Sequence, residues 1–256
     1  MSATEQGNHP PTISPRGLAA VMLKLMRVAP MHGGEVPGGA TRLLSGYSSA
    51  YLFPIDQAGQ QYGLIDTGVD AKAEEILAVL RYKGLDARAV RAIFLTHEHL
   101  DHTAGIRQFP EADVYVGTED RSYLEGTAAS DGFLPSLAGK KSDLAPLDPA
   151  KLHSIGDGEV VTIGDRHVRA FAVPGHTQGS RAYLIGDTLY AGDAVTYDRS
   201  QKAMKPPKPV SFSVPQAVVS LGKLVERFDA EGIVVQTVVP SHSGEGSFDA
   251  LRALGK

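Results

Sequence analysis

Residues 97–102 read His-Glu-His-Leu-Asp-His and directly follow the apolar stretch 92–95. Such a stretch predicts a buried strand, so the run is expected where that strand ends. If the backbone stays extended there, His97 and His99 point to the same side. A solvated polar loop is the alternative interpretation, but it does not account for three histidines within six residues. The run therefore predicts a metal site at a strand end, which any fold of this chain must accommodate.

A helix is expected over residues 103–109, and it would turn the chain after the run. Asp101 and His102 would then face a second point close to the first. The chain has no cysteine, so nitrogen and oxygen atoms must hold any metal. Imidazole and carboxylate are ligands that zinc, iron and manganese accept. The run is therefore compatible with two divalent metal ions, one at His97 and His99 and one at Asp101 and His102.

The remaining hydrophobic pattern alternates between strands and helices. Short apolar runs predict strands at residues 50–54, 62–66, 92–95, 113–116, 160–163, 167–173, 181–185 and 234–239. Helical spacing predicts helices at residues 71–83, 215–228 and 248–254. This order predicts sheets covered by helices, in an α/β or α+β fold.

The N-terminal part differs in composition from the rest. Residues 1–16 are polar and aperiodic, which predicts a disordered leader. Residues 17–40 are expected to hold a short amphipathic helix (18–28) and a glycine-rich segment, and residues 41–256 the main domain. The helix is too short and too charged to span a bilayer. We expect it to pack on the domain; docking to a membrane surface is the alternative, and its apolar face also offers a homodimer interface.

Residues 122–149 contain scattered glycine, serine, proline and lysine with little periodicity. A loop this long within a domain is typically functional or disordered, and we expect it to be a lid over the active site. The net charge of -4 and pI of about 6.1 give no sign of a nucleic-acid partner. With no clear signal peptide or apolar span, a cytoplasmic protein is expected.

At its motifs the sequence resembles the metallo-β-lactamase superfamily, whose signature His-x-His-x-Asp-His matches residues 97–102 without a gap. The other family motifs occur in the family's order along the chain, the first before this run and three after it: Asp66-Thr67-Gly68, Pro174-Gly175-His176-Thr177, Gly192-Asp193 and Ser241-His242. The resemblance covers about residues 45–245, and it is closest to lactonase-like and glyoxalase II-like members. It implies an α+β fold, a four-layer αβ/βα sandwich of two mixed β-sheets flanked by helices.

The resemblance also implies a two-metal ligand set. His97, His99 and His176 would surround the first metal, while Asp101, His102 and His242 would hold the second. Asp193 would bridge the two ions, which are most often zinc, with iron or manganese as alternatives. Asp66 would support the ligands by accepting a hydrogen bond from an imidazole N–H.

The ligand set implies the chemistry. Two cations about 3.5–4 Å apart lower the pKa of a shared water, and the resulting metal-bound hydroxide attacks a carbonyl carbon or a phosphorus. A metal then stabilises the developing oxyanion. Asp101 is a candidate to orient the nucleophile or to pass a proton. Lactonases of this family have a tyrosine where this chain has Thr196, so we consider the adjacent Tyr197 as a hydrogen-bond donor to the substrate.

The motifs leave the substrate open. Fourteen residues follow His242 in this sequence, so we do not expect the helical domain that follows this position in glyoxalase II. The sequence after Asp193 also has no large insertion of the kind found in nuclease members. A small-molecule ester, lactone or thioester is therefore favoured. A phosphodiester or a β-lactam is the alternative within the same fold. A non-catalytic metal-binding module is the alternative of another class, and the complete ligand set disfavours it.

Overall fold

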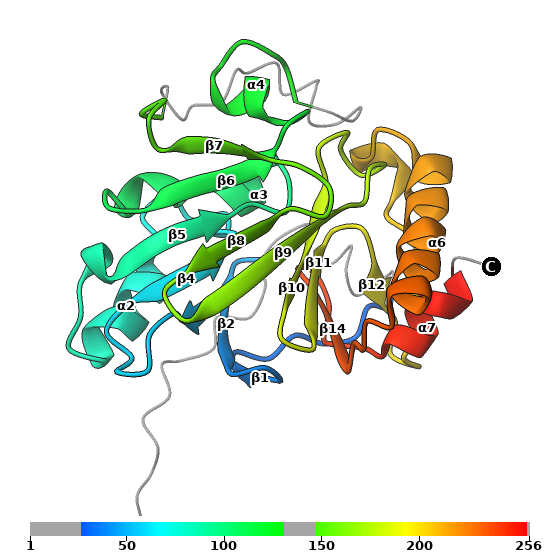
Figure 1. The fold of residues 1–256 in the computed structure, drawn as a ribbon, viewed down its shortest axis with the longest axis horizontal. Coiled ribbons are helices and arrows are strands. Elements are labelled where there is room, and N and C mark those ends of the chain that lie inside the picture. Colours follow the sequence, from blue (N-terminus) through cyan, green and yellow to red (C-terminus); the bar gives the residue numbers. More distant parts are fainter. Residues whose placement is uncertain (1–26, 131–146, 255–256) are drawn as a thin grey trace, which may run out of the picture.

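The first of two facing sheets contains seven strands in the order β1-β2-β3-β4-β5-β6-β7 (Figure 1). The computed structural model describes residues 27–130 and 147–254. Strands β1 to β4 are antiparallel, and β4 to β7 are parallel. Their bounds are Gly34–Val36, Ala40–Ser45, Ser48–Pro54, Tyr62–Ile65, Val90–Phe94, Asp113–Gly117 and Leu152–Ile155. Because β4, β5 and β6 run in one direction, their carboxyl ends lie along one edge of the sheet.

The second sheet has five strands in the order β14-β11-β10-β9-β8. Strands β8 to β11 form an antiparallel meander, and β14 is parallel to β11. Their bounds are Val160–Ile163, Arg166–Ala172, Arg181–Ile185, Thr188–Gly192 and Thr237–Pro240. Since β9 and β11 are both antiparallel to β10, the strands β9, β11 and β14 also end at a common edge. A separate ribbon pairs β12 (Thr196–Tyr197) with β13 (Ala203–Met204).

Helices cover the outer faces of both sheets. Helix α2 (Glu74–Tyr82) packs on the first sheet, and α6 (Val214–Glu231) and α7 (Phe248–Leu254) pack on the second (Figure 1). Short helices are α3 (Leu100–Thr103), α4 (Arg121–Leu124) and the 3₁₀ turns Ala87–Ala89, Ile106–Gln108 and Lys208–Val210. The predicted four-layer sandwich of two mixed sheets is confirmed.

Three apolar clusters hold these layers together. One lies between α2 and the first sheet, another between the second sheet and α6 and α7, and the third between the sheets. The inter-sheet cluster is rich in aromatic rings: Tyr51, Phe53, Phe94, Tyr183 and Tyr190. Strands buried on both faces are nearly continuously apolar, which explains why short apolar runs located most of them.

Several boundaries differ from the sequence prediction. The helix expected at residues 103–109 is wrong: α3 begins at Leu100, and a separate 3₁₀ turn follows. Asp101 and His102 therefore lie on the helical turn itself. The last strand begins at Thr237, not at residue 234. The short strands β1, β2, β7, β11, β12 and β13 were not predicted as strands.

The start of the described chain packs against the second half of the molecule. The Ala29 N–H donates to the Tyr197 carbonyl at 2.8 Å, and β1 pairs with β2 inside the first sheet. The predicted leader, nearly all of the predicted helix at 18–28 and residues 131–146 of the predicted lid lie outside the described residues. Among the helices that the structure describes, none has the length and hydropathy to cross a membrane.

Candidate metal centre

The carboxyl ends of strands from both sheets converge on one point. Asp66 follows β4, residues 97–102 follow β5, His176 lies shortly after β9, Asp193 follows β11, and His242 lies just after β14. All seven predicted metal ligands meet there. They form three overlapping groups whose ligand atoms lie within 4.8 Å of one another: His97, His99 and His176; His97, His102 and Asp193; Asp101, His102 and His242.

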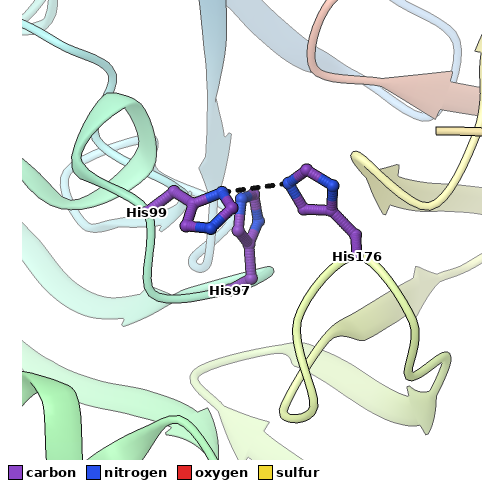
Figure 2. A group of neighbouring side chains, drawn as sticks. All are labelled: His97, His99 and His176. Carbon is purple, nitrogen blue, oxygen red and sulfur yellow. Dashed lines mark hydrogen bonds between the residues drawn. The ribbon is translucent and has the colours of Figure 1, made fainter. Parts of the chain in front are cut away.

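The first group consists of three buried imidazoles (Figure 2). His97 and His99 come from the segment after β5, and His176 faces them from the opposite loop. The His99 Nδ1 and His176 Nε2 atoms are 3.0 Å apart, and the His97 ring centroid lies 4.6 Å from each of the other two. Two ligand nitrogens on one tetrahedral zinc lie about 3.3 Å apart, given bonds of about 2.0–2.1 Å. The three rings therefore have the spacing of ligands to a single cation.

The second group adjoins the first, since the His97 and His102 ring centroids are 4.0 Å apart. The His242 Nε2 atom lies 3.3 Å from Asp101 Oδ2 and 2.9 Å from Asp193 Oδ2. The same Asp193 oxygen is 3.4 Å from His176 Nε2. Asp193 thus lies between the two groups, where a bridging carboxylate would be needed.

Buried atoms that lack partners point to a cation. Within the described part of the chain, His97 Nε2, His102 Nε2 and Asp193 Oδ1 are buried and have no hydrogen-bond partner. Buried polar atoms are normally hydrogen-bonded, because an unsatisfied one destabilises the fold. These three atoms belong to the same cluster, and nitrogen and carboxylate oxygen are ligands of divalent cations. The residues present therefore fit a metal.

In four of these imidazoles the Nδ1 atom lies within hydrogen-bond distance of a polar group outside the cluster, which fixes the orientation of the ring. His102 Nδ1 lies 2.8 Å from Asp66 Oδ2, and His242 Nδ1 donates to the Tyr47 carbonyl at 2.8 Å. His97 Nδ1 is 3.1 Å from the hydroxyl of Thr96, and His176 Nδ1 is 3.2 Å from that of Ser211.

Burial keeps two imidazoles of the first group, His97 and His176, neutral in the metal-free protein. Burial and the neighbouring imidazoles hold the pKa of His97 well below its usual value. Burial likewise lowers the pKa of His176 to about 3, although Asp193 opposes the shift. At neutral pH both rings therefore offer lone pairs to a cation without first losing a proton.

The second group is charged instead. Burial opposes the charging of His102 and His242, but the facing carboxylates outweigh it and raise both pKa values, that of His242 to about 10. The same pairing holds the pKa of Asp101 and of Asp193 below the usual range, against the opposing effect of burial. A cation entering this group must displace protons.

Asp66 is fully buried where β4 ends, in the left-handed region of backbone space with φ of 59°. Its carboxylate accepts hydrogen bonds from the Thr96 N–H at 2.7 Å and the Thr96 hydroxyl at 2.8 Å, and it faces His102 Nδ1. The structure thus places Asp66 behind the ligands, between the segment 96–102 and the end of β4.

Tyr197 is not brought to the cluster. Its hydroxyl donates to the Ser247 carbonyl at 2.9 Å, and its ring is buried in the apolar cluster beneath α6 and α7. Tyr47 lies at the cluster instead, with its ring stacked on that of His242 at a centroid distance of 5.8 Å. Tyr47 is in the β2–β3 turn, outside every motif, so the sequence carried no signal for it.

The histidines expected to lie outside the site are, where described, elsewhere. His153 is on β7 and pairs with Asp113 at 3.1 Å, and His167 is on β9 at the surface, with His32 exposed near the N-terminal end. Ser130, in the first part of the predicted lid, donates to Glu98 Oε1 at 2.8 Å. The lid segment therefore contacts the ligand-bearing run.

Comparison with known proteins agrees with this geometry. Residues 46–242, more than half of the chain, match the family described as the Metallo-beta-lactamase superfamily. A hydroxyacylglutathione hydrolase of Aliivibrio fischeri is 33% identical over 108 residues, 41% of this chain and 32% of that protein. An acyl-coenzyme A thioesterase of Gallus gallus is 31% identical over 163 residues, 57% of this chain and 54% of that protein. The chain spans about a third to a half of the length of these curated relatives.

Solved structures show the same fold. A B3 metallo-beta-lactamase with an active-site glutamic acid has a TM-score of 0.62 at 22% identity, covering 94% of this chain and 91% of that chain. An archaeal metallo-beta-lactamase superfamily protein of Sulfolobus tokodaii has a TM-score of 0.59 at 19% identity, covering 88% and 85%. With the match over residues 46–242 and the ligands gathered at the strand ends, the chain belongs to the metallo-beta-lactamase superfamily.

Proposed function

We propose that the protein is a binuclear metal-dependent hydrolase that cleaves a small-molecule thioester, with an ester or lactone as the nearest alternative. The observation that supports this most strongly is the pair of adjoining ligand groups with Asp193 between them. A single structural metal would need only one closed set of ligands, whereas a hydrolytic site of two metals needs two sets that share ligands.

Different side chains would bind the two cations and orient the attacking water. Two divalent cations, most often zinc, would supply an activated water and a Lewis acid for the carbonyl oxygen. The imidazoles of His97, His99 and His176 would hold one of them, and Asp101, His102 and His242 the other. Asp101 is partly exposed, so we assign it the further role of orienting the attacking water from the solvent side. Hydrolysis forms a bond from the water oxygen to the acyl carbon, breaks the C–S bond and releases one proton.

The thioester is favoured by the relatives. One is named as a hydrolase of hydroxyacylglutathione and the other as an acyl-coenzyme A thioesterase, and both names describe the cleavage of an acyl thioester. The β-lactamases among the solved structures are 22% identical, and that likeness supports the fold alone. Cleavage of a β-lactam or a phosphodiester is therefore an alternative outcome of the test.

The test is a substrate panel on protein loaded with zinc, iron or manganese. The panel contains an acylglutathione, an acyl-coenzyme A, an aryl ester, a lactone, a β-lactam and an aryl phosphodiester. Because the chain has no cysteine, a thiol reagent reports the released thiol without a protein background. We expect the highest kcat/KM on one of the two thioesters. Bound metal with no turnover of any substrate would overturn the hydrolase and favour a metal-binding module.

A further inference from the structure

Asp120 is a buried carboxylate outside the predicted ligand set and outside every motif. It lies between the end of β6 and the start of α4, and only 3% of its surface is exposed. A buried carboxylate needs hydrogen-bond donors to remain stable in the fold. The positions of its hydrogen-bond donors show which segments of the chain Asp120 connects.

The donors come from the two loops that carry the first ligand group. The Gly179 N–H donates to Asp120 Oδ1 at 2.6 Å, and the Thr177 hydroxyl donates to Oδ2 at 2.7 Å; Thr177 is the next residue after His176, and Gly179 lies in the same loop. The Glu98 N–H donates to the same Oδ2 at 3.1 Å, and Glu98 lies between His97 and His99. One side chain thus contacts the backbone beside all three imidazoles.

The packing at this point leaves little freedom. A Cβ atom at Gly179 would lie 2.4 Å from the Asp120 carboxylate, so the loop approaches the carboxylate more closely than any side chain would allow. A Cβ atom at Gly117, the last residue of β6, would lie 2.0 Å from the Gly179 carbonyl oxygen. The loop after His176 is therefore seated against the end of β6 with Asp120 as its anchor.

We propose that Asp120 is a positioning residue of the first metal site, a carboxylate that sets the separation between the His97–His99 segment and His176. It does so through backbone N–H groups and Thr177, and it is not itself a ligand. Asp66 faces a ligand ring directly, whereas Asp120 fixes the loops on which the rings stand. The inference rests on the proposed metal site, but its test needs no substrate.

The first test is Asp120→Asn, which has nearly the same shape but offers one acceptor oxygen in place of two. In either orientation of the amide, its NH2 group faces at least one of the three donors, which then loses its acceptor, so zinc affinity at the first site should fall by about 10- to 100-fold, the usual effect of losing a partner behind the ligands. Competition with a chromophoric chelator measures the affinity. The visible spectrum of the cobalt-substituted protein reports whether the number of nitrogen ligands changes. Asp113→Asn, at the half-exposed carboxylate of the first residue of β6, is the matched control and should change neither.

A second pair of variants keeps the test decisive if Asp120→Asn fails to fold. Thr177→Val removes the hydroxyl without changing the shape, and should weaken zinc binding by roughly 3- to 10-fold, as expected for one hydrogen bond. Thr177→Ser retains the hydroxyl and should restore the affinity. Wild-type affinity and an unchanged cobalt spectrum in Thr177→Val, and in Asp120→Asn if that variant folds, would overturn the inference. Failure of the wild-type protein to bind any metal would instead overturn the proposed function on which it rests.

Discussion

At the scale of single residues, four imidazoles of the cluster have one nitrogen in the cluster and the other against a partner behind it. The partners differ: a carboxylate for His102, a carbonyl for His242 and hydroxyls for His97 and His176. Such contacts select the tautomer and prevent ring rotation, which prepares the free nitrogen for a cation. Removing a ligand should therefore affect metal binding far more than removing any surface histidine.

We predict that His99→Ala lowers the metal content to one equivalent or less and reduces hydrolysis by more than about 100-fold, since even partners behind a ligand contribute 10- to 100-fold. His167→Ala, at the surface on β9, is the control and should retain both properties. Elemental analysis and the thiol-release assay measure them. Near-normal metal content and activity in His99→Ala would refute the assignment of the ligands.

A substitution of Tyr197 tests whether this residue donates a hydrogen bond to the substrate, as the sequence suggested. Its hydroxyl donates to the carbonyl of Ser247, the residue before α7, which also accepts from the Leu251 N–H at 3.3 Å. Tyr197→Phe removes one of these two hydrogen bonds, which should lower the free energy of unfolding by about 0.5–1.5 kcal/mol. We expect kcat/KM to stay within about twofold, because a group acting only on stability leaves the transition state unchanged. Denaturant unfolding and steady-state kinetics distinguish the outcomes, and a large loss of kcat at unchanged stability would restore the catalytic role.

The two ligand groups should respond differently to pH. His176, with a pKa of about 3, is already neutral at pH 7, whereas His242, with a pKa of about 10, must release a proton when a cation binds. At pH values below its raised pKa, His242 is mainly protonated and cannot bind a cation. The affinity of the second group for a cation should therefore rise with pH. We expect about a tenfold rise per pH unit for each proton released, from about pH 6 to about pH 9. Chelator competition at several pH values measures both steps, and equal slopes would contradict the assignment.

At the scale of elements, the site is formed by residues at the ends of strands. The sequence predicts the position of such a residue where a family motif coincides with the end of a strand. Residues 97–102 follow an apolar strand and Asp193 follows a glycine, so both were located from the sequence. The turn after the run was misplaced, because α3 is a single helical turn that begins inside the motif at Leu100. Asp120 and Tyr47 escaped notice because their roles depend on contacts with residues far along the chain. A local sequence pattern does not predict contacts between residues that are far apart in the sequence.

Strand β11 ends at Gly192, directly before Asp193, and the backbone at this position requires a glycine. Its φ of 54° is in the left-handed region, and a Cβ atom there would lie 2.6 Å from the Thr96 Cβ. Gly192→Ala should therefore lower the free energy of unfolding by more than about 2 kcal/mol, by strain and overpacking together, and it should weaken metal binding. Gly84→Ala has a similar φ of 76° with no atom within 4 Å, and should show the strain alone, about 1–2 kcal/mol. Equal effects of the two substitutions would contradict the close approach.

At the scale of the whole molecule, the proposed ligands come from both halves of the sandwich. The first sheet supplies His97, His99, Asp101 and His102, and the second supplies His176, Asp193 and His242. A bound cation therefore links the two sheets across the edge where their strands end. The apolar cluster between the sheets holds the halves together in its own right, so the metal-free protein should remain folded.

Metal removal should lower stability by mass action. A cation that binds only the folded state adds about 2.7 kcal/mol per site when its concentration is 100 times the dissociation constant. We predict that a chelator lowers the Tm, that zinc restores it, and that the effect is reduced in Asp120→Asn. Differential scanning calorimetry with and without chelator measures the change. A Tm that does not respond to zinc would indicate that the cluster does not hold the metal.

The central claim is that seven side chains from two sheets hold two divalent cations. Anomalous diffraction at the zinc edge, from crystals of the zinc-loaded protein, tests it most directly. We expect two peaks per chain, one among His97, His99 and His176 and one among Asp101, His102 and His242, with Asp193 between them. No peak in the cluster, or a single peak that leaves either group without a metal, would contradict it.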